Sequence, residues 1–265
     1  MRLWQANAVS LLTLVSAHSA GTAAEELLRA IPLQDLKSGS AFLAPATVAQ
    51  QNDLALNPGM LWVEQGEKLW SAAPPRGDKS CAACHGKPET MKGVSVRFPR
   101  VEERSGKLVN LELKINECRS ERQKAQPFAY ESAELLSLTA LIAHQSRGLP
   151  MSLAIDERTR PVLKAGEALY NSRQGQLNLA CALCHNDNWG RRLHSETVSQ
   201  GHPTGYPVYR LEWQSMGSLH RRLRSCFFGV RAEMFPPGSN EHLALELYLT
   251  WRAQGLTVET PAIRR

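Results

Sequence analysis

The 265-residue sequence lacks any apolar run of the roughly 18–20 residues that a membrane-spanning helix needs, which excludes a polytopic membrane protein. Cysteine is scarce, and six residues in a chain of this length are too few for a disulfide scaffold. Charge of one sign is not in large excess, since 31 basic residues face 25 acidic ones, and the apolar fraction of 43% is ordinary. These values exclude bulk disorder and predict a globular chain of two domains.

Two other patterns are missing. No basic stripe interleaved with aromatic residues is present, and the one short basic cluster, at residues 220–224, is isolated, so nucleic-acid binding is not expected. Strand signals are weak throughout, which favours a mainly helical fold.

The N-terminus is typical of a secretory signal peptide. Arg2 precedes an apolar segment over residues 8–17, and small residues follow at 19–24. This order favours export over the alternative of an amphipathic first helix. We expect a signal peptide at residues 1–24, an N-terminal extension at 25–50, and a periplasmic location in which disulfides are permitted.

The sequence contains an internal repeat. Two blocks recur at an offset of 100: residues 66–70 as 166–170, and residues 81–85 as 181–185. A third block follows in the same order, with residues 136–139 recurring as 247–250 at an offset of 111. We therefore predict two tandem cytochrome c-like domains related by internal duplication, at residues 51–152 and 153–265.

Each copy has the same predicted plan. A short helix precedes a loop with a Cys-x-x-Cys-His motif, and an irregular stretch then leads to a closing amphipathic helix. Ser132 caps the first closing helix, and Ser239 or Asn240 caps the second. Gly66 and Gly166 would allow two helices to cross closely, with Trp70 or Tyr170 packing beside them.

The two Cys-x-x-Cys-His motifs predict covalent haem. Two thiols on one turn add to the vinyl groups of haem c, and the adjacent histidine becomes the proximal ligand. A random chain of this composition would hold roughly 0.004 such motifs. A thioredoxin-like pair would need a βαβ pattern, and a shared zinc site would have to bridge two equivalent domains. We therefore predict two haems c, held by Cys81, Cys84, Cys181 and Cys184, with axial ligands His85 and His185.

Thiolates are the leading candidates for the distal ligands. No methionine or other histidine occupies equivalent places in the two copies, whereas the two remaining cysteines, Cys118 and Cys226, fall one in each copy. Because exported proteins permit disulfides, a Cys118–Cys226 bridge remains the alternative. Thiolate ligation would lower the reduction potential of both irons.

The second copy differs from the first in its arginines. Arg222 precedes Cys226 by four residues and would share a helix face with it, while Arg252 takes the place that Leu141 holds in the first closing helix. Guanidinium groups bind oxyanions bidentately and keep a thiolate charged, so an anion site at the second haem is one interpretation. Pairing with haem propionates or exposure to solvent is the other.

With these features the sequence resembles the dihaem SoxA subunits of the SoxAX cytochromes, the L-cysteine S-thiosulfotransferases. The resemblance covers nearly the whole mature chain. The segments that carry it are residues 57–63, 81–85, 116–119, 181–185, 231–236 and 244–249.

The resemblance implies an activity and its partners. In this family thiosulfate is joined oxidatively to a cysteine of a sulfur-carrier protein (SoxYZ), and two electrons pass through a monohaem subunit (SoxX) to an electron-acceptor cytochrome c. It implies that the second haem is the active site, that Cys226 is the catalytic ligand and carries a persulfide, and that Arg222 binds substrate. Transfer of a substrate role to Arg252 is weaker. Some members lack the first haem.

Two other functions remain open from the sequence. A dihaem thiosulfate dehydrogenase would couple two thiosulfates to tetrathionate and need no carrier protein. A plain dihaem electron carrier would have no substrate site, and removal of Arg222 would not affect it.

Overall fold

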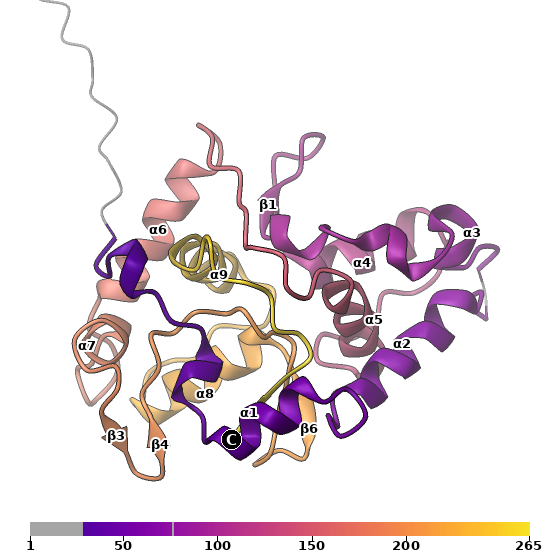
Figure 1. Ribbon diagram of the computed structural model, residues 1–265. Helices are drawn as coiled ribbons and strands as arrows, with labels where there is room; N and C mark the ends of the chain where they lie inside the picture. Colours follow the sequence, from indigo (N-terminus) through magenta and orange to yellow (C-terminus); the bar gives the residue numbers. More distant parts are fainter. Residues whose placement is uncertain (1–28, 76) are drawn as a thin grey trace, which may run out of the picture.

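Two pairs of crossed helices form the framework of the molecule (Figure 1). The computed structural model describes residues 29–75 and 77–265, so the predicted signal peptide lies outside the described residues. The two pairs are α2 (Met60–Ser71) with α5 (Ala133–His144) and α6 (Arg160–Asn171) with α9 (Asn240–Arg252). The expected mainly helical architecture is therefore observed.

Each pair crosses at a glycine, as the sequence predicts. A Cβ atom on Gly66 would overlap the backbone oxygen of Ser137 in α5, and a Cβ on Gly166 would overlap that of Ala244 in α9. Glycine is required at both positions because the backbones of the two helices approach each other directly.

The crossings correct one detail of the predicted repeat. Gly66 faces the Cβ of Leu141, and Gly166 faces the Cβ of Tyr248. The closing helices therefore correspond at an offset of 107 rather than 111, and Leu141 matches Tyr248. The prediction that Arg252 takes the place of Leu141 is wrong, because short Leu-rich blocks recur within one helix and misled the alignment.

Four helices recur in the same order in each copy. The remaining members are α3 (Cys81–His85), α4 (Leu111–Glu121), α7 (Cys181–His185) and α8 (Leu219–Gly229). The motifs lie on one-turn helices rather than in the expected loops. α4 and α8 occupy stretches that were expected to be irregular, and each begins at a side-chain cap, Asn110 accepting from Leu113 N and Ser218 accepting from Arg221 N.

The closing helices carry the cores. Ser132 and Ser239 cap them as predicted, accepting from Leu135 N and His242 N. The first core lies between α2, α4 and α5, and the second lies between α6, α8 and α9. Within residues 29–75 and 77–265, no helix has the length and apolar character needed to span a membrane.

Short strands and 3-10 turns connect these helices. The strands are β1 (Arg100–Val101), β2 (Leu108–Val109), β3 (Arg192–Leu193), β4 (Glu196–Thr197), β5 (Val208–Arg210), β6 (Ser215–Gly217) and β7 (Ala262–Arg264). The 3-10 turns are Leu33–Asp35, Gly39–Phe42, Pro88–Met91 and Ser95–Arg97. β1 pairs with β2, β3 with β4, and β5 lies between antiparallel β6 and parallel β7.

The two copies interlock through segments at the chain ends. Helix α1 (Pro45–Asn52) lies beside β7, where Gln51 Oε1 accepts from Ile263 N at 3.0 Å. Met216 of β6 is fully buried in the first core, although it belongs to the second copy. The predicted boundary between residues 152 and 153 separates the helix pairs, while these segments cross between them.

A buried polar cluster lies where the copies meet. Asn110 Nδ2 donates to Tyr130 Oη at 2.7 Å and to Glu246 Oε2 at 3.0 Å. The same carboxylate oxygen lies 2.9 Å from Nε2 of His220, whose ring stacks on that of Tyr130. Burial, together with the nearby Glu246 carboxylate, raises the pKa of Glu112 to about 8. Glu112 is therefore protonated in the folded protein at neutral pH.

This pKa predicts how stability depends on pH. Between about pH 4.5 and 8 the folded chain keeps a proton on Glu112 that the unfolded chain releases, so stability falls as pH rises through this window. We expect Glu112→Gln to match the wild type at about pH 5 and to be more stable by at least about 1 kcal/mol at about pH 8. Urea unfolding followed by circular dichroism measures both. The exposed Glu103→Gln is the control, and a stability difference independent of pH would contradict the assignment.

Candidate functional site

The first motif lies on the single turn of α3. Ser80 caps it, its Oγ accepting from Ala83 N at 3.0 Å, which fixes the start of the turn at Cys81. Cys81 and Cys84 are three residues apart and therefore lie on the same side of this turn. Trp70 of α2 donates from Nε1 to the Gly86 oxygen at 2.8 Å and places its ring 5.8 Å from that of His85. The helix pair thus positions the residue that follows the histidine.

Cys118 lies beside this motif. It is in α4, and its thiol is close enough to Cys81 to contribute, after burial, to the raised pKa of Cys81. Gln123, just after α4, has its Nε2 3.6 Å from Cys81 Sγ. Burial raises the pKa of the Cys118 thiol.

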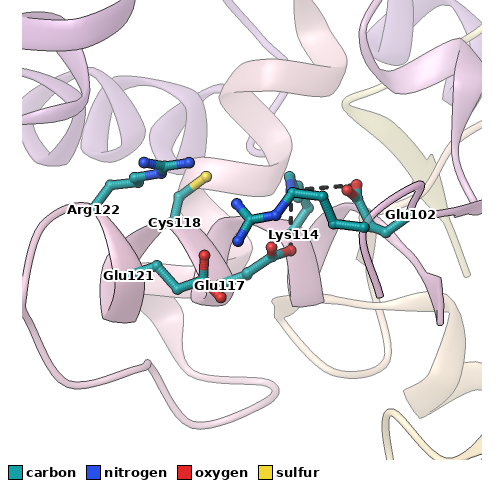
Figure 2. Close-up of a pocket in the computed structure, with 7 residues that line it drawn as sticks. Glu102, Lys114, Glu117, Cys118, Glu121 and Arg122 are labelled. Atoms are coloured by element: carbon teal, nitrogen blue, oxygen red, sulfur yellow. Dashed lines mark hydrogen bonds and ion pairs between the residues drawn. The ribbon is translucent and has the colours of Figure 1, made fainter. Parts of the chain in front are cut away.

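The surroundings of Cys118 carry charges of both signs. Figure 2 shows its sulfur in a pocket that also has Glu121 and Arg122 on its wall. Lys114 Nζ pairs with Glu117 at 3.0 Å and with Glu102 at 3.3 Å. The carboxylates compensate much of the positive charge, so the pocket attracts an anion only weakly.

The second motif lies on α7 and is more enclosed. His185 Nδ1 lies 2.7 Å from the Ser199 oxygen, so Nδ1 carries the proton and Nε2 keeps a lone pair. Gly201, at φ +75°, lies against the imidazole, and a Cβ there would be 3.1 Å from Cγ of the ring. Burial lowers the pKa of His185 to about 4, so the ring is neutral, the form that ligates iron.

Cys226 lies beside the second motif, as Cys118 lies beside the first. Burial, together with the nearby Cys226, raises the pKa of Cys181 to about 11. Cys184 is partly buried near Cys226, and its pKa is raised for the same two reasons. All six cysteines are free thiols, so the alternative of a Cys118–Cys226 disulfide is not found.

Arg222 lies one helical turn before Cys226 on α8. This stretch is helical, so the two side chains lie on one face, as the spacing of four residues would require. The nearby Cys226 sulfur is the main cause that raises the pKa of Arg222, and Tyr206 adds to it. The Arg222 side chain is one-third exposed, with an Nη2–Oε2 ion pair to Glu196 at 4.0 Å. No hydrogen bond holds its guanidinium within the described chain, so its donors are available to a ligand.

Arg252 lies deeper than Arg222. The residue is 4% exposed, and its guanidinium donates to the Gln200 oxygen at 3.0 Å and to Asn186 Oδ1 at 2.7 Å. Its charge stacks over the ring of Tyr170 at 4.5 Å. Through these hydrogen bonds Arg252 links the closing helix α9 to Asn186, the residue after His185, and to the loop at Gln200.

Sequence reasoning missed three residues at these sites. Tyr206 faces Arg222 and Cys226, Glu196 approaches Arg222, and Gln123 reaches Cys81. Each comes from a turn or a two-residue strand with no fixed spacing to a motif. Only Gln123, five residues after Cys118, lies close enough in sequence to a candidate ligand to have been predicted near the site.

The residues of both sites fit a covalent haem c. Each motif supplies two thiols on one helical turn and an adjacent histidine, and at the second site Nε2 of His185 is left available by the Nδ1 bond. Each site adds one thiol from a neighbouring helix. This donor set matches a histidine–thiolate ligand pair.

Comparisons with known proteins agree with this geometry. A family model described as the SoxA/TsdA cytochrome c domain matches residues 65–151, and such a domain binds haem c covalently. The L-cysteine S-thiosulfotransferase subunit SoxA of Pseudaminobacter salicylatoxidans is 40% identical over 236 residues, covering 88% of this chain and 82% of that protein. The subunit of the same name from Paracoccus pantotrophus is 37% identical over 227 residues, covering 86% and 78%.

A solved structure extends the match to the fold. The crystal structure of SoxXA from Paracoccus pantotrophus has a chain that superposes with a TM-score of 0.84 at 37% identity, covering 87% of both chains. The expected cytochrome c-type fold is confirmed. Because identity, coverage and backbone all agree, this chain belongs to the SoxA family of L-cysteine S-thiosulfotransferase subunits.

Proposed function

We propose that this chain is an exported dihaem cytochrome c that couples thiosulfate oxidatively to a cysteine of a sulfur-carrier protein. The product is a cysteine S-thiosulfonate, and two electrons leave to an electron-acceptor cytochrome c. Family membership supports the transferase activity, and the duplicated Cys-x-x-Cys-His motifs, each with a neighbouring lone thiol, support two haems.

One observation carries the assignment of the active site. Cys226 lies beside both motif cysteines of the second copy, and Arg222, one turn away on the same helix, is coupled to it electrostatically. No matching arginine lies one turn before Cys118, where the chain has Lys114 paired with two glutamates. An anionic substrate is therefore attracted to the second thiol rather than to the first.

The reaction defines what these residues must do. The carrier thiol and the thiosulfate dianion form one S–S bond, and one S–H bond breaks, releasing one proton and two electrons. Haem c, when bound, supplies iron that accepts electrons. The Arg222 guanidinium binds sulfonate oxygens in its planar fork and holds the sulfane sulfur beside Cys226.

Other residues keep the site in shape. Asn186, which follows the second histidine, accepts from Tyr170 Oη at 2.9 Å and from Arg252 Nη2 at 2.7 Å. Three helices thereby meet at the residue after His185. We propose that Arg252 contributes to substrate binding through this support, as well as through its positive charge near Cys181.

The proposed partners of this chain are periplasmic proteins. The name SoxXA of the matching structure supports a monohaem SoxX-like subunit as heterodimer partner. A SoxYZ-like carrier protein supplies the acceptor cysteine. The order of basic, apolar and small residues at 1–24 supports export to the periplasm.

The first prediction concerns cofactor content. We expect the mature protein, purified without reductant, to carry two haems and an additional sulfur that a mild reductant removes, since Cys226 is expected to hold a persulfide. Intact mass before and after reduction measures both. A Cys81→Ala/Cys84→Ala variant should keep one haem. A wild-type mass two hydrogens short, with no added sulfur, would contradict the assignment by indicating a disulfide.

The second prediction separates the two lone thiols. Cys226→Ala should abolish formation of the S-thiosulfonate, whereas the matched Cys118→Ala should keep transfer chemistry at the second site. Each variant should lose one of the two low-spin, thiolate-ligated ferric signals in the electron paramagnetic resonance spectrum. Normal turnover by Cys226→Ala with both haems bound would refute a catalytic thiol. Tetrathionate formed by the wild type without carrier would instead indicate a thiosulfate dehydrogenase.

The third prediction concerns Arg222. Arg222→Lys keeps the charge and removes the bidentate fork, so kcat/KM for thiosulfate should fall roughly 10- to 100-fold, equivalent to about 1.4–2.8 kcal/mol. The neighbouring Arg221, which stacks on Trp213 at 4.1 Å, provides the control. Arg221→Lys should change kcat/KM by no more than about twofold. Equal losses in the two variants would contradict a specific role for Arg222.

A further inference from the structure

A carboxylate outside the motifs lies between two arginines at the second site. Glu196 is in β4 of the short β3–β4 hairpin, paired with Leu193. Its Oε1 accepts from Arg210 Nη2 at 3.2 Å, and its Oε2 lies 4.0 Å from Arg222 Nη2. One oxygen is thus committed to each arginine.

The Arg210 side of this arrangement is fixed. Arg210 is in β5, the central strand of the three-stranded sheet, and its side chain is 4% exposed. Its guanidinium also stacks on Trp213, 5.1 Å from the ring centroid. Because a buried guanidinium needs a counter-charge, it holds the Glu196 carboxylate firmly. A second acid, Glu212, reaches the same nitrogen at 3.6 Å but is half exposed.

The Arg222 side is open to a ligand. Its guanidinium is planar, with donors along three edges, and Glu196 approaches only one terminal nitrogen. Cys226 and Tyr206 also interact with its charge. A carboxylate at one end of the plane therefore sets the direction in which the remaining donors point.

We propose that Glu196 is a positioning residue for the thiosulfate site. Anchored by Arg210, it orients the Arg222 guanidinium so that the free edge of the fork meets the sulfonate beside Cys226. This inference rests on the substrate role proposed for Arg222 and adds what fixes its geometry.

Positioning and simple electrostatics predict opposite changes when the carboxylate is removed. Glu196→Gln takes away a negative charge near the binding site, which by itself would strengthen binding of a dianion and lower KM. Loss of orientation would instead weaken binding and raise KM while leaving kcat nearly unchanged. The sign of the change in KM therefore distinguishes the two roles.

The test uses the haem-loaded chain in complex with its monohaem partner. We expect Glu196→Gln to raise KM for thiosulfate roughly three- to tenfold, with kcat within about twofold of wild type. Glu212→Gln is the matched control, because it removes an acid whose charge also acts on Arg222 but which forms its ion pair with Arg210, and its KM should stay within about twofold. An unchanged or lower KM in Glu196→Gln would overturn the proposal.

A double-mutant cycle addresses a general loosening of the hairpin. If Glu196 acts through the Arg222 fork, Glu196→Gln should change KM by less than about twofold in an Arg222→Lys background. Additive effects would assign it a structural role and overturn the proposal.

Calorimetric titration of the oxidised complex with thiosulfate needs no turnover. It should show the same rise in Kd for Glu196→Gln, and an unchanged or lower Kd would overturn the proposal. This measurement still tests Glu196 if the wild-type complex forms no S-thiosulfonate, a result that would refute the proposed function separately.

Discussion

The direct contact of helix backbones at Gly66 and Gly166 is the constraint on which the rest of the structure depends. With no side chain between the crossed helices, Trp70 and Tyr170, one turn further on, reach across to the residues that follow each motif. A larger residue at either crossing would push the helices apart and move these aromatic anchors away from the histidine. The position of each Cys-x-x-Cys-His motif is thus fixed by aromatic side chains of the core as well as by its own short helical turn.

The same framework supports two sites of different chemistry. At the first, Cys118 lies among lysine, arginine and glutamate side chains whose charges largely cancel. At the second, Cys226 is coupled to Arg222, which a hairpin carboxylate approaches from the other side. Both halves present the same helix framework and one lone thiol, and they differ in a few charged side chains on α8 and in the strands around it.

Much of the fold could be predicted where covalent or backbone geometry restricts the sequence. The glycines of the crossings and the serine caps each have only a few chemical solutions, and both were found in the predicted roles. Helix α4 was missed because it is polar and gives little periodic signal. Helix α8 was missed although Leu219, Leu223 and Phe227 recur at a helical spacing, which could have predicted it. Glu196 and Tyr206 were missed because tertiary folding alone brings a hairpin and a turn to Arg222.

The interlocking of the copies constrains what the chain can lose. Met216 of the second copy fills the first core, and Gln51 holds the backbone of the last strand. Deleting the first copy would therefore leave an apolar side chain in water and a strand end without its partner. Point substitution of the residues proposed to hold iron in the first copy would leave these contacts intact, whereas loss of the surrounding polypeptide would break them. The structure therefore constrains the polypeptide of the first copy more tightly than it constrains any cofactor held there.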